Sequence, residues 1–283
     1  VILVALRRFV DERGLDPKTT FFWLCNYCIA QNAARDADGN AGAEVKRLGE
    51  VVRTIRHTAM FLNPWDQAGA LNRAWVLWEL YHTAACRAKF DVLITAVEAA
   101  RFLDALAEDP NAVANAFAHI DVRNATAHNP DDLKAIMADV ATIGADHLNA
   151  TVFTQLRGWA VGVARREAEK TEGAEGAESA GTLRAKMNLA ILLQNLGESA
   201  EARAMYEEVV AGYTAQLGAT HTDTLRAKMN LAILLQNLGE SAEARAMYEE
   251  VVAGYTAQLG ATHTDTLRAK MNLAILLQNL GES

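Results

Sequence analysis

The stretch TLRAKMNLAILLQNLGESAEARAMYEEVVAGYTAQLGATHTD at residues 182–223 decides the fold of the carboxyl-terminal end, because residues 224–265 repeat it letter for letter. Residues 266–283 repeat its first 18 letters. An exact repeat of 42 residues does not arise by chance, and periods of about 20–50 residues are typical of arrays whose units pack on their neighbours. We therefore predict an all-α solenoid built from residues 182–223, 224–265 and the partial unit 266–283.

Each repeat is predicted to contain two helices. The first spans about 183–196, where apolar residues recur at helical spacing, and Gly197 ends it because glycine tolerates a positive φ. The second begins after Ser199, runs to about Leu217 and ends at Gly218. Short polar side chains can accept the free N–H groups at helix starts, and the candidate caps are Ser199, Thr222 and Asp223.

One face of the first helices is polar and recurs in each repeat. Its four positions lie 4, 3 and 4 residues apart, which places them on one side of a helix. Asn can donate and accept hydrogen bonds and Arg offers a planar set of donors, so the face suits a peptide backbone with an acidic group. A solvated face without a ligand is the alternative. The predicted peptide-binding residues are Arg184, Asn188, Ile191, Asn195, Arg226, Asn230, Ile233 and Asn237.

The repeats carry a family pattern. The letters N-L-A-x-L-L-x-x-L-G at residues 188–197, followed by Glu201, Ala202 and Tyr206, resemble the tetratricopeptide repeat (TPR). The letters L-G-x-x-H-x-x-T at residues 217–224 are similar to the kinesin-light-chain type of this repeat. The resemblance covers residues 182–283 and implies a concave face, lined by first helices, that binds a peptide or protein partner.

The remainder of the chain has a different composition. All five Trp, eight Phe, four Pro and three Cys lie before residue 181. Residues 169–181 are rich in Gly, Ala and Glu and have no apolar face, which predicts a solvated linker or a frayed helix end. The predicted domains are therefore residues 1–168, the linker 169–181 and the repeats 182–283.

The net charge indicates which classes of partner to exclude, and the cysteine content indicates which cellular compartment to expect. The net charge of −8 argues against a nucleic acid or an anionic membrane as the main partner. No apolar run is long enough to span a membrane. Three cysteines are too few for a disulfide framework in a chain of 283 residues, so we expect a reducing compartment, the cytoplasm.

Residues 1–168 are predicted to form an α/β domain, a mostly parallel sheet with flanking helices, because strand-like and helix-like segments alternate. The predicted strands are 20–30, 58–62 and 90–95, with 119–122 as a candidate edge strand. The predicted helices are 2–12, 43–57, 71–88, 96–107, 131–141 and 147–169. So few strands suggest that a first strand before Val1 is missing and that the chain is a fragment.

Three segments of this domain carry a second resemblance. They are F-W-x-x-x-x-C-x-x-Q at 22–31, P-W-D at 64–66 and R-A-W-V-L-W-E-L at 73–80. Together they resemble a Toll/interleukin-receptor-like (TIR-like) domain of the kind joined to such repeats in protist and algal proteins, which implies signalling or self-association. Cys25 stands where related sequences often carry Asp, and the first strand with its loop is lacking, which puts a nucleotide site in doubt.

The same resemblance implies that Glu79 is the catalytic residue of members that cleave NAD. A carboxylate there could hold a ribose hydroxyl and stabilise positive charge as nicotinamide leaves, as carboxylates do at glycosidic bonds. We expected Glu79 to open the helix that follows a strand end, a usual place for a ligand cleft. The structural alternative is that Glu79 pairs with Arg73 or Lys89, or is solvated, and that Trp75 and Trp78 anchor the core.

No cofactor or metal is predicted. His82 and Cys86 share a helix face without further ligands, and Cys25 and Cys28 point to opposite faces of the predicted strand. NAD enters only as a substrate of the enzyme alternative. The first hypothesis is therefore a protein-interaction scaffold with possible self-association through the TIR-like domain, and the alternative is an NAD-hydrolysing enzyme using Glu79. A cargo adaptor would need a heptad coiled coil, which the sequence does not show.

Overall fold

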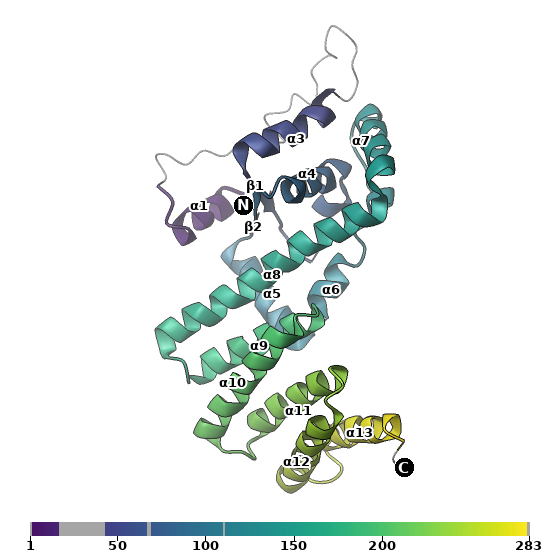
Figure 1. Cartoon of the computed structure of the whole chain (residues 1–283). Coiled ribbons are helices and arrows are strands. Elements are labelled where there is room, and N and C mark those ends of the chain that lie inside the picture. The colour runs from purple at the N-terminus through teal and green to yellow at the C-terminus, as the bar shows by residue number, and fades with distance from the viewer. Residues whose placement is uncertain (1, 17–42, 67–68, 110, 282–283) are drawn as a thin grey trace. The chain divides into compact units, whose positions relative to one another are not determined.

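The computed structural model describes residues 2–16, 43–66, 69–109 and 111–281 (Figure 1). The chain divides into two compact units, one formed by residues 1–105 and 112–160 and the other by residues 106–111 and 161–283. The predicted strand at 20–30, with Cys25 and Cys28, lies outside the described residues.

The first unit contains a parallel pair of strands. β1 (His57–Phe61) pairs with β2 (Lys89–Leu93), with His57 opposite Lys89. Parallel strands need a crossover connection, and here it consists of the short 3-10 helix η1 (Ala70–Asn72) and the helix α4 (Ala74–Ala85). The described part of this unit is thus mostly helical around a two-stranded sheet, which is less sheet than the predicted α/β domain requires.

Further helices surround this pair of strands. Before it lie α1 (Ile2–Glu12) and α3 (Ala43–Ile55). After it lie α5 (Ala96–Glu108), α6 (Ala112–Phe117), the 3-10 helix η2 (Val122–Asn124), α7 (Pro130–Ile143) and the long α8 (Ala145–Glu175). The predicted helices and the strands 58–62 and 90–95 are confirmed, most of them to within three residues at each end, whereas the last helix extends six residues beyond its predicted end.

Aromatic and aliphatic side chains form the core of the first unit. Leu6 and Phe9 on α1 pack against Leu93 at the end of β2. The ring of Phe102 lies 5.0 Å from that of Trp65 and 5.2 Å from that of Trp159, measured between centroids. These edge-on and tilted contacts are the arrangements that aromatic pairs prefer.

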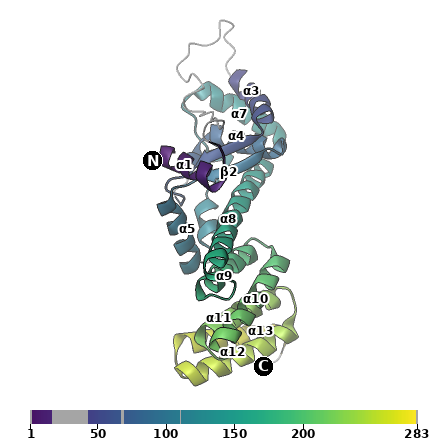
Figure 2. The ribbon, with the colours of Figure 1, turned by 90° about the vertical axis from the view of Figure 1, so that its left-hand side faces the viewer.

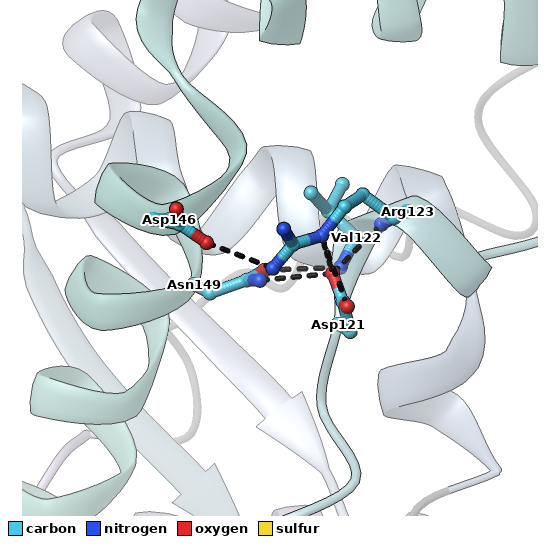
Figure 3. Close-up of polar contacts among 5 residues, drawn as sticks. All are labelled: Asp121, Val122, Arg123, Asp146 and Asn149. Carbon is cyan, nitrogen blue, oxygen red and sulfur yellow. Dashed lines mark hydrogen bonds and ion pairs between the residues drawn. The ribbon is translucent and has the colours of Figure 1, made fainter.

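The predicted edge strand at 119–122 is wrong, and a polar cluster gives the reason (Figure 3). The Asp121 carboxylate accepts hydrogen bonds from the backbone N–H and the side chain of Arg123 and from Asn149 Nδ2, at 2.8–3.0 Å. The N–H of Val122 donates to Asn149 Oδ1 at 2.9 Å, and Arg123 also pairs with Asp146 at 2.8 Å. Side chains thus take the backbone groups that a strand would pair, and they tie η2 to the start of α8.

The second unit contains the repeats as helical hairpins. Its helices are α9 (Ala180–Asn195), α10 (Ser199–Leu217), α11 (Thr222–Asn237), α12 (Ser241–Leu259) and α13 (Thr264–Asn279). Both views show consecutive helices of the array side by side (Figures 1 and 2). The predicted pair of helices per repeat is confirmed, and Gly197 and Gly218 have the positive φ expected of residues that end helices.

The predicted helix caps are wrong. Ser199 is already the first residue of α10, and Glu198 before it makes no capping bond through its side chain. Between repeats, His221 precedes α11, and its Nδ1 accepts a hydrogen bond from the N–H of Asp223 at 3.2 Å. His263 does the same for α13. An imidazole nitrogen therefore caps the helix, in place of the predicted caps Thr222 and Asp223.

The predicted linker also differs from the structure. Helix α8 continues through Glu175, and α9 begins at Ala180. Glu172 in the last part of α8 pairs with Lys186 of α9 at 3.2 Å, so this polar segment is tied to the array although it lacks an apolar face.

Candidate functional site

The start of each first helix is fixed by one recurring contact. Thr224 is fully buried, and its Oγ1 donates to the carbonyl of Gly218 at 2.8 Å. Thr266 and Gly260 form the same contact at 2.8 Å. A buried hydroxyl is stabilised only when it is hydrogen-bonded, so this bond holds the turn and thereby orients the face of the helix that follows.

The predicted binding residues lie on α9 and α11, and we call them the first-helix stripe. Its outer members are exposed: Arg184, Asn195, Arg226 and Asn237. Its inner members are half-buried: Asn188, Ile191, Asn230 and Ile233. The two helices meet at this stripe, because Asn230 Nδ2 approaches Met187 Sδ at 3.8 Å. The residues of neighbouring repeats therefore form one continuous surface.

Part of the stripe is already engaged within the array. The amide of Asn230 donates to the thioether of Met187, which is a weak acceptor. Arg226 pairs with Asp223 one turn earlier at 2.8 Å. Because these contacts are weak or exposed to water, they leave both groups available to a stronger acceptor.

Arg184 and Arg226 hold equivalent positions in their helices but have different partners. Asp223 lies three residues before Arg226. At the equivalent place before Arg184, the chain has Gly181. Among the described residues, no carboxylate pairs with Arg184. The exposed guanidinium of Arg184 can thus bind an anion without giving up an ion pair within the described residues.

Both arginines lie near one buried hydroxyl. Burial raises the pKa of Tyr213 and the charge of Asp223 raises it further, whereas the positive charges of Arg226 and Arg184 lower it. Both guanidinium groups therefore contribute positive charge to the surroundings of the same phenol. The stripe thus offers positive charge from consecutive repeats to an acidic group of a ligand, and its amides can bind a peptide backbone.

A half-repeat, which we did not predict from the sequence, precedes the first repeat. The Oγ1 of Thr182 donates to the carbonyl of Gly176 at 2.9 Å, as Thr224 does to Gly218, and Gly176 has a positive φ like Gly218. Ser179 takes the capping position that His221 takes later. Residues 161–175 of α8 therefore stand in for a second helix. The letters G-A-x-x-x-x-T-L, at 176–183 and again at 218–225, are the signal that could have revealed it.

Lys186 joins this half-repeat to the first full repeat. Its ammonium group is buried and pairs with Glu172 of α8 at 3.2 Å and with Glu208 of α10 at 2.5 Å. Burial by itself lowers the pKa of Lys186, but the hydrogen bonds that Lys186 donates to Glu208 and Glu172, and the charges of these carboxylates, raise it overall. The lysine therefore stays charged and holds three helices of the array together.

Glu79 does not open its helix as predicted, because α4 begins at Ala74. The carboxylate is half-buried and forms no hydrogen bond or ion pair with another described residue, so neither Arg73 nor Lys89 pairs with it. Burial raises the pKa of Glu79. A raised pKa disfavours the ionised form, which is the form that would stabilise a positive transition state.

The tryptophans beside Glu79 take part in packing. Trp78 is buried and its Nε1 donates to the carbonyl of Val45 at 3.4 Å. Trp75 is half-buried and its Nε1 donates to Asp132 Oδ2 at 3.2 Å. His82 packs edge-on against Trp78 at 4.5 Å, and burial lowers its pKa. The side chains of Trp75 and Trp78 therefore anchor α4 to α7 and α3, respectively.

The described residues contain neither a candidate metal site nor a candidate membrane-spanning helix. No three His, Cys, Asp or Glu side chains gather there in an arrangement that could hold a metal ion. No helix in the described ranges is long and apolar enough to cross a membrane.

Comparison with known proteins agrees with the array. A family model described as tetratricopeptide repeat matches residues 181–257 and, in a second match, residues 223–283. The repeats are tetratricopeptide repeats. No curated protein matches the chain.

The chain is also similar to two solved structures. One, from Podosopora anserina, contains nearly identical TPR-like repeats of a kinesin light chain; it is 23% identical, with 65% of this chain and 83% of that chain covered and a TM-score of 0.41. The other is BtubC (BKLC) from P. vanneervenii, 16% identical, with 87% and 85% covered and a TM-score of 0.42.

Proposed function

We propose that this chain is a protein-interaction scaffold whose TPR array binds an acidic peptide or protein segment on the first-helix stripe. The observation that carries the proposal is that Arg184 and Arg226, at equivalent positions of two consecutive first helices, are both exposed and both contribute positive charge at Tyr213. TPR arrays are protein-binding modules, and an exposed pair of guanidinium groups favours a ligand with carboxylates.

The stripe supplies recognition of two kinds. The arginines bind a charged side chain or a chain terminus, and Asn188 and Asn195 can donate to and accept from an extended backbone. Ile191 adds an apolar contact between the amides. A segment that alternates an acidic with an apolar residue fits this order better than a uniformly charged one.

We also propose a role for the first unit. We assign it a role in signalling or self-association, as its TIR-like segments imply, with β1, α4 and β2 as the described part of a parallel α/β arrangement. NAD hydrolysis remains the alternative function, and the raised pKa of Glu79 counts against it.

The test selects ligands for the whole chain from a displayed library of random 12-residue peptides. We expect enrichment of peptides that carry Asp or Glu. Arg184→Glu combined with Arg226→Glu should weaken binding of a selected peptide by about tenfold or more, because a charge-assisted hydrogen bond contributes about 1.5–3 kcal/mol.

Arg245→Glu is the matched control, since it makes the same charge change on the second helix α12, where Arg245 pairs with Glu249. Circular dichroism of each variant verifies that the array is folded. Enrichment of peptides without acidic residues, or equal affinity in the stripe variant and the control, would contradict the proposal.

A further inference from the structure

Two arginines of the first unit stand where this chain otherwise uses glycine. Arg56 and Arg87 have φ values of 62° and 50°, in the left-handed region. Every other described residue with a positive φ is a glycine, as at Gly197 and Gly218. Glycine adopts this conformation readily, whereas an L side chain is unfavourable in it. The two arginines therefore cost stability where they stand, which points to a use for their side chains.

Each of the two arginines lies between the end of a helix and the start of a strand. The N–H of Arg56 donates to the carbonyl of Val52 at 2.8 Å at the end of α3, and β1 follows. The N–H of Arg87 donates to the carbonyl of Ala84 at 2.9 Å at the end of α4, and β2 follows. The N–H of Lys89 donates to the carbonyl of Arg56 at 2.9 Å. Because β1 and β2 are parallel neighbours, both arginines lie at the amino-terminal edge of the sheet.

A third arginine adds to the positive charge at this edge. Arg53 lies one turn before Arg56, and we call Arg53, Arg56 and Arg87 the arginine edge. All three are exposed, and no other described side chain forms an ion pair or a hydrogen bond with any of them. Arg53 already places a positive charge in the last turn of α3, so Arg56 is not needed to offset the helix dipole. The three guanidinium groups are therefore available to an anion.

The carboxylate of β2 does not neutralise the arginine edge. Asp91 is buried, its Oδ2 lies 2.8 Å from His57 Nε2, and it forms an ion pair with Arg13 of α1. The ammonium group of Lys89 lies 3.8 Å from the same carboxylate. Asp91 thus has three cationic or polar partners of its own, and it serves to hold α1 on the strands.

We propose that the arginine edge binds a phosphorylated segment of a partner protein. A phosphate monoester carries about −1.5 to −2 charges at neutral pH and has three acceptor oxygens. Guanidinium groups match these oxygens with paired N–H donors, and arginine clusters are a recurring means of recognising phosphorylated peptides. Duplex nucleic acid and anionic membranes fit less well, because the net charge of −8 repels an extended polyanion. The arginine edge shares no residue with the first-helix stripe.

The test probes an array of 12-residue peptides, each with a central phosphoserine and random flanking residues, with the whole chain. The chain carries Arg184→Glu with Arg226→Glu, so that the first-helix stripe does not select acidic peptides. We expect the array to yield phosphopeptides whose unphosphorylated counterparts bind about tenfold or more weakly, as measured by fluorescence anisotropy. An array without a bound phosphopeptide, or equal affinity with and without the phosphate, overturns the proposal.

Arg56→Gly combined with Arg87→Gly separates binding from folding. Glycine suits the left-handed backbone better than arginine, so Tm should stay the same or rise. Affinity for the selected phosphopeptide should nevertheless fall about tenfold or more, because two charged donors are lost. The matched control, Arg47→Gln with Arg73→Gln, removes the same charge towards the opposite ends of α3 and α4 and should change the affinity by less than about twofold.

The remaining outcomes contradict the proposal. A lower Tm in the glycine variant would show that the two arginines are needed for folding. Unchanged affinity in the glycine variant would place the phosphopeptide elsewhere, and an equal loss in the control would show that only net charge matters. Tighter binding of the chain to duplex DNA, or to vesicles that contain anionic lipid, than to any phosphopeptide would assign the arginine edge to a different class of partner.

Discussion

Helices α11 and α13 have the same sixteen residues but different surroundings. Helix α11 is packed against α12 after it and α10 before it, whereas among described residues α13 has only the preceding side of the array. Leu225 is consequently buried and Leu267 exposed. The comparison shows that burial in a repeat array is a property of a residue's neighbours, and that identical letters can be core in one copy and surface in the next.

The largest test of this comparison is one truncation made at both positions. Leu225→Ala removes a fully packed side chain and should lower the free energy of unfolding of the array by about 2–5 kcal/mol. Leu267→Ala removes an exposed side chain and should change it by about 0.5 kcal/mol or less. Urea denaturation followed by circular dichroism measures both, and equal losses would break the comparison.

A second test measures how the contribution of Tyr248 to stability depends on pH. Tyr248 is a buried residue of α12 that contacts α11. Burial raises the pKa of Tyr248 to about 12, against about 10 in an unfolded chain. A group whose pKa is raised by folding contributes stability below its unfolded pKa and loses that contribution as the pH rises through the folded value. The stabilisation by Tyr248 should thus be complete below pH 10 and decline towards pH 12.

Tyr248→Phe makes this decline measurable. At pH 8 the variant should be about 1 kcal/mol less stable than the parent chain, since it lacks the bond to Gln236. Above pH 10 the difference should shrink and change sign, because the buried phenol can ionise only in the parent. A constant difference between pH 8 and pH 12 would show that the hydroxyl is not buried as described.

The smallest effect is expected in the first unit, at the half-buried carboxylate of Glu79. This group contrasts with Lys186 of the second unit, whose charge is paired with two carboxylates. Burial raises the pKa of Glu79, so its ionisation opposes folding at neutral pH. Glu79→Gln should raise Tm at pH 7, by about 2–4 °C for each kcal/mol gained in a domain of comparable size, and should have no effect below the unfolded pKa. A lower Tm, or consumption of NAD that this variant abolishes, would contradict the structural interpretation of Glu79.

The two units also differ in how far their sequences predicted them. The boundaries of the repeat helices follow from apolar periodicity and from glycines such as Gly197, because each contact is local and recurs. His221 as a helix cap was missed because an imidazole is an unusual capping group. The half-repeat in α8 was missed because only its turn, from Gly176 to Leu183, keeps the letters of the later repeats.

In the first unit the errors come from contacts between distant residues. The edge strand at 119–122 was predicted from local composition, but Asp121 and Val122 are held by Asn149, and no local pattern shows that pairing.

The first-helix stripe of the second unit could be predicted as a face, because spacing defines a helix face. That Arg226 is paired and Arg184 is not follows from comparing Asp223 with Gly181, although only the structure shows that the charges of both arginines act on Tyr213.

The most direct test of the scaffold is the affinity of a selected acidic peptide for the whole chain, measured by titration calorimetry. The account predicts that Arg184→Glu with Arg226→Glu raises Kd about tenfold or more, while Arg245→Glu leaves it within about twofold. An unchanged Kd in the stripe variant, with its circular dichroism spectrum intact, would contradict the claim that the first-helix stripe binds the partner.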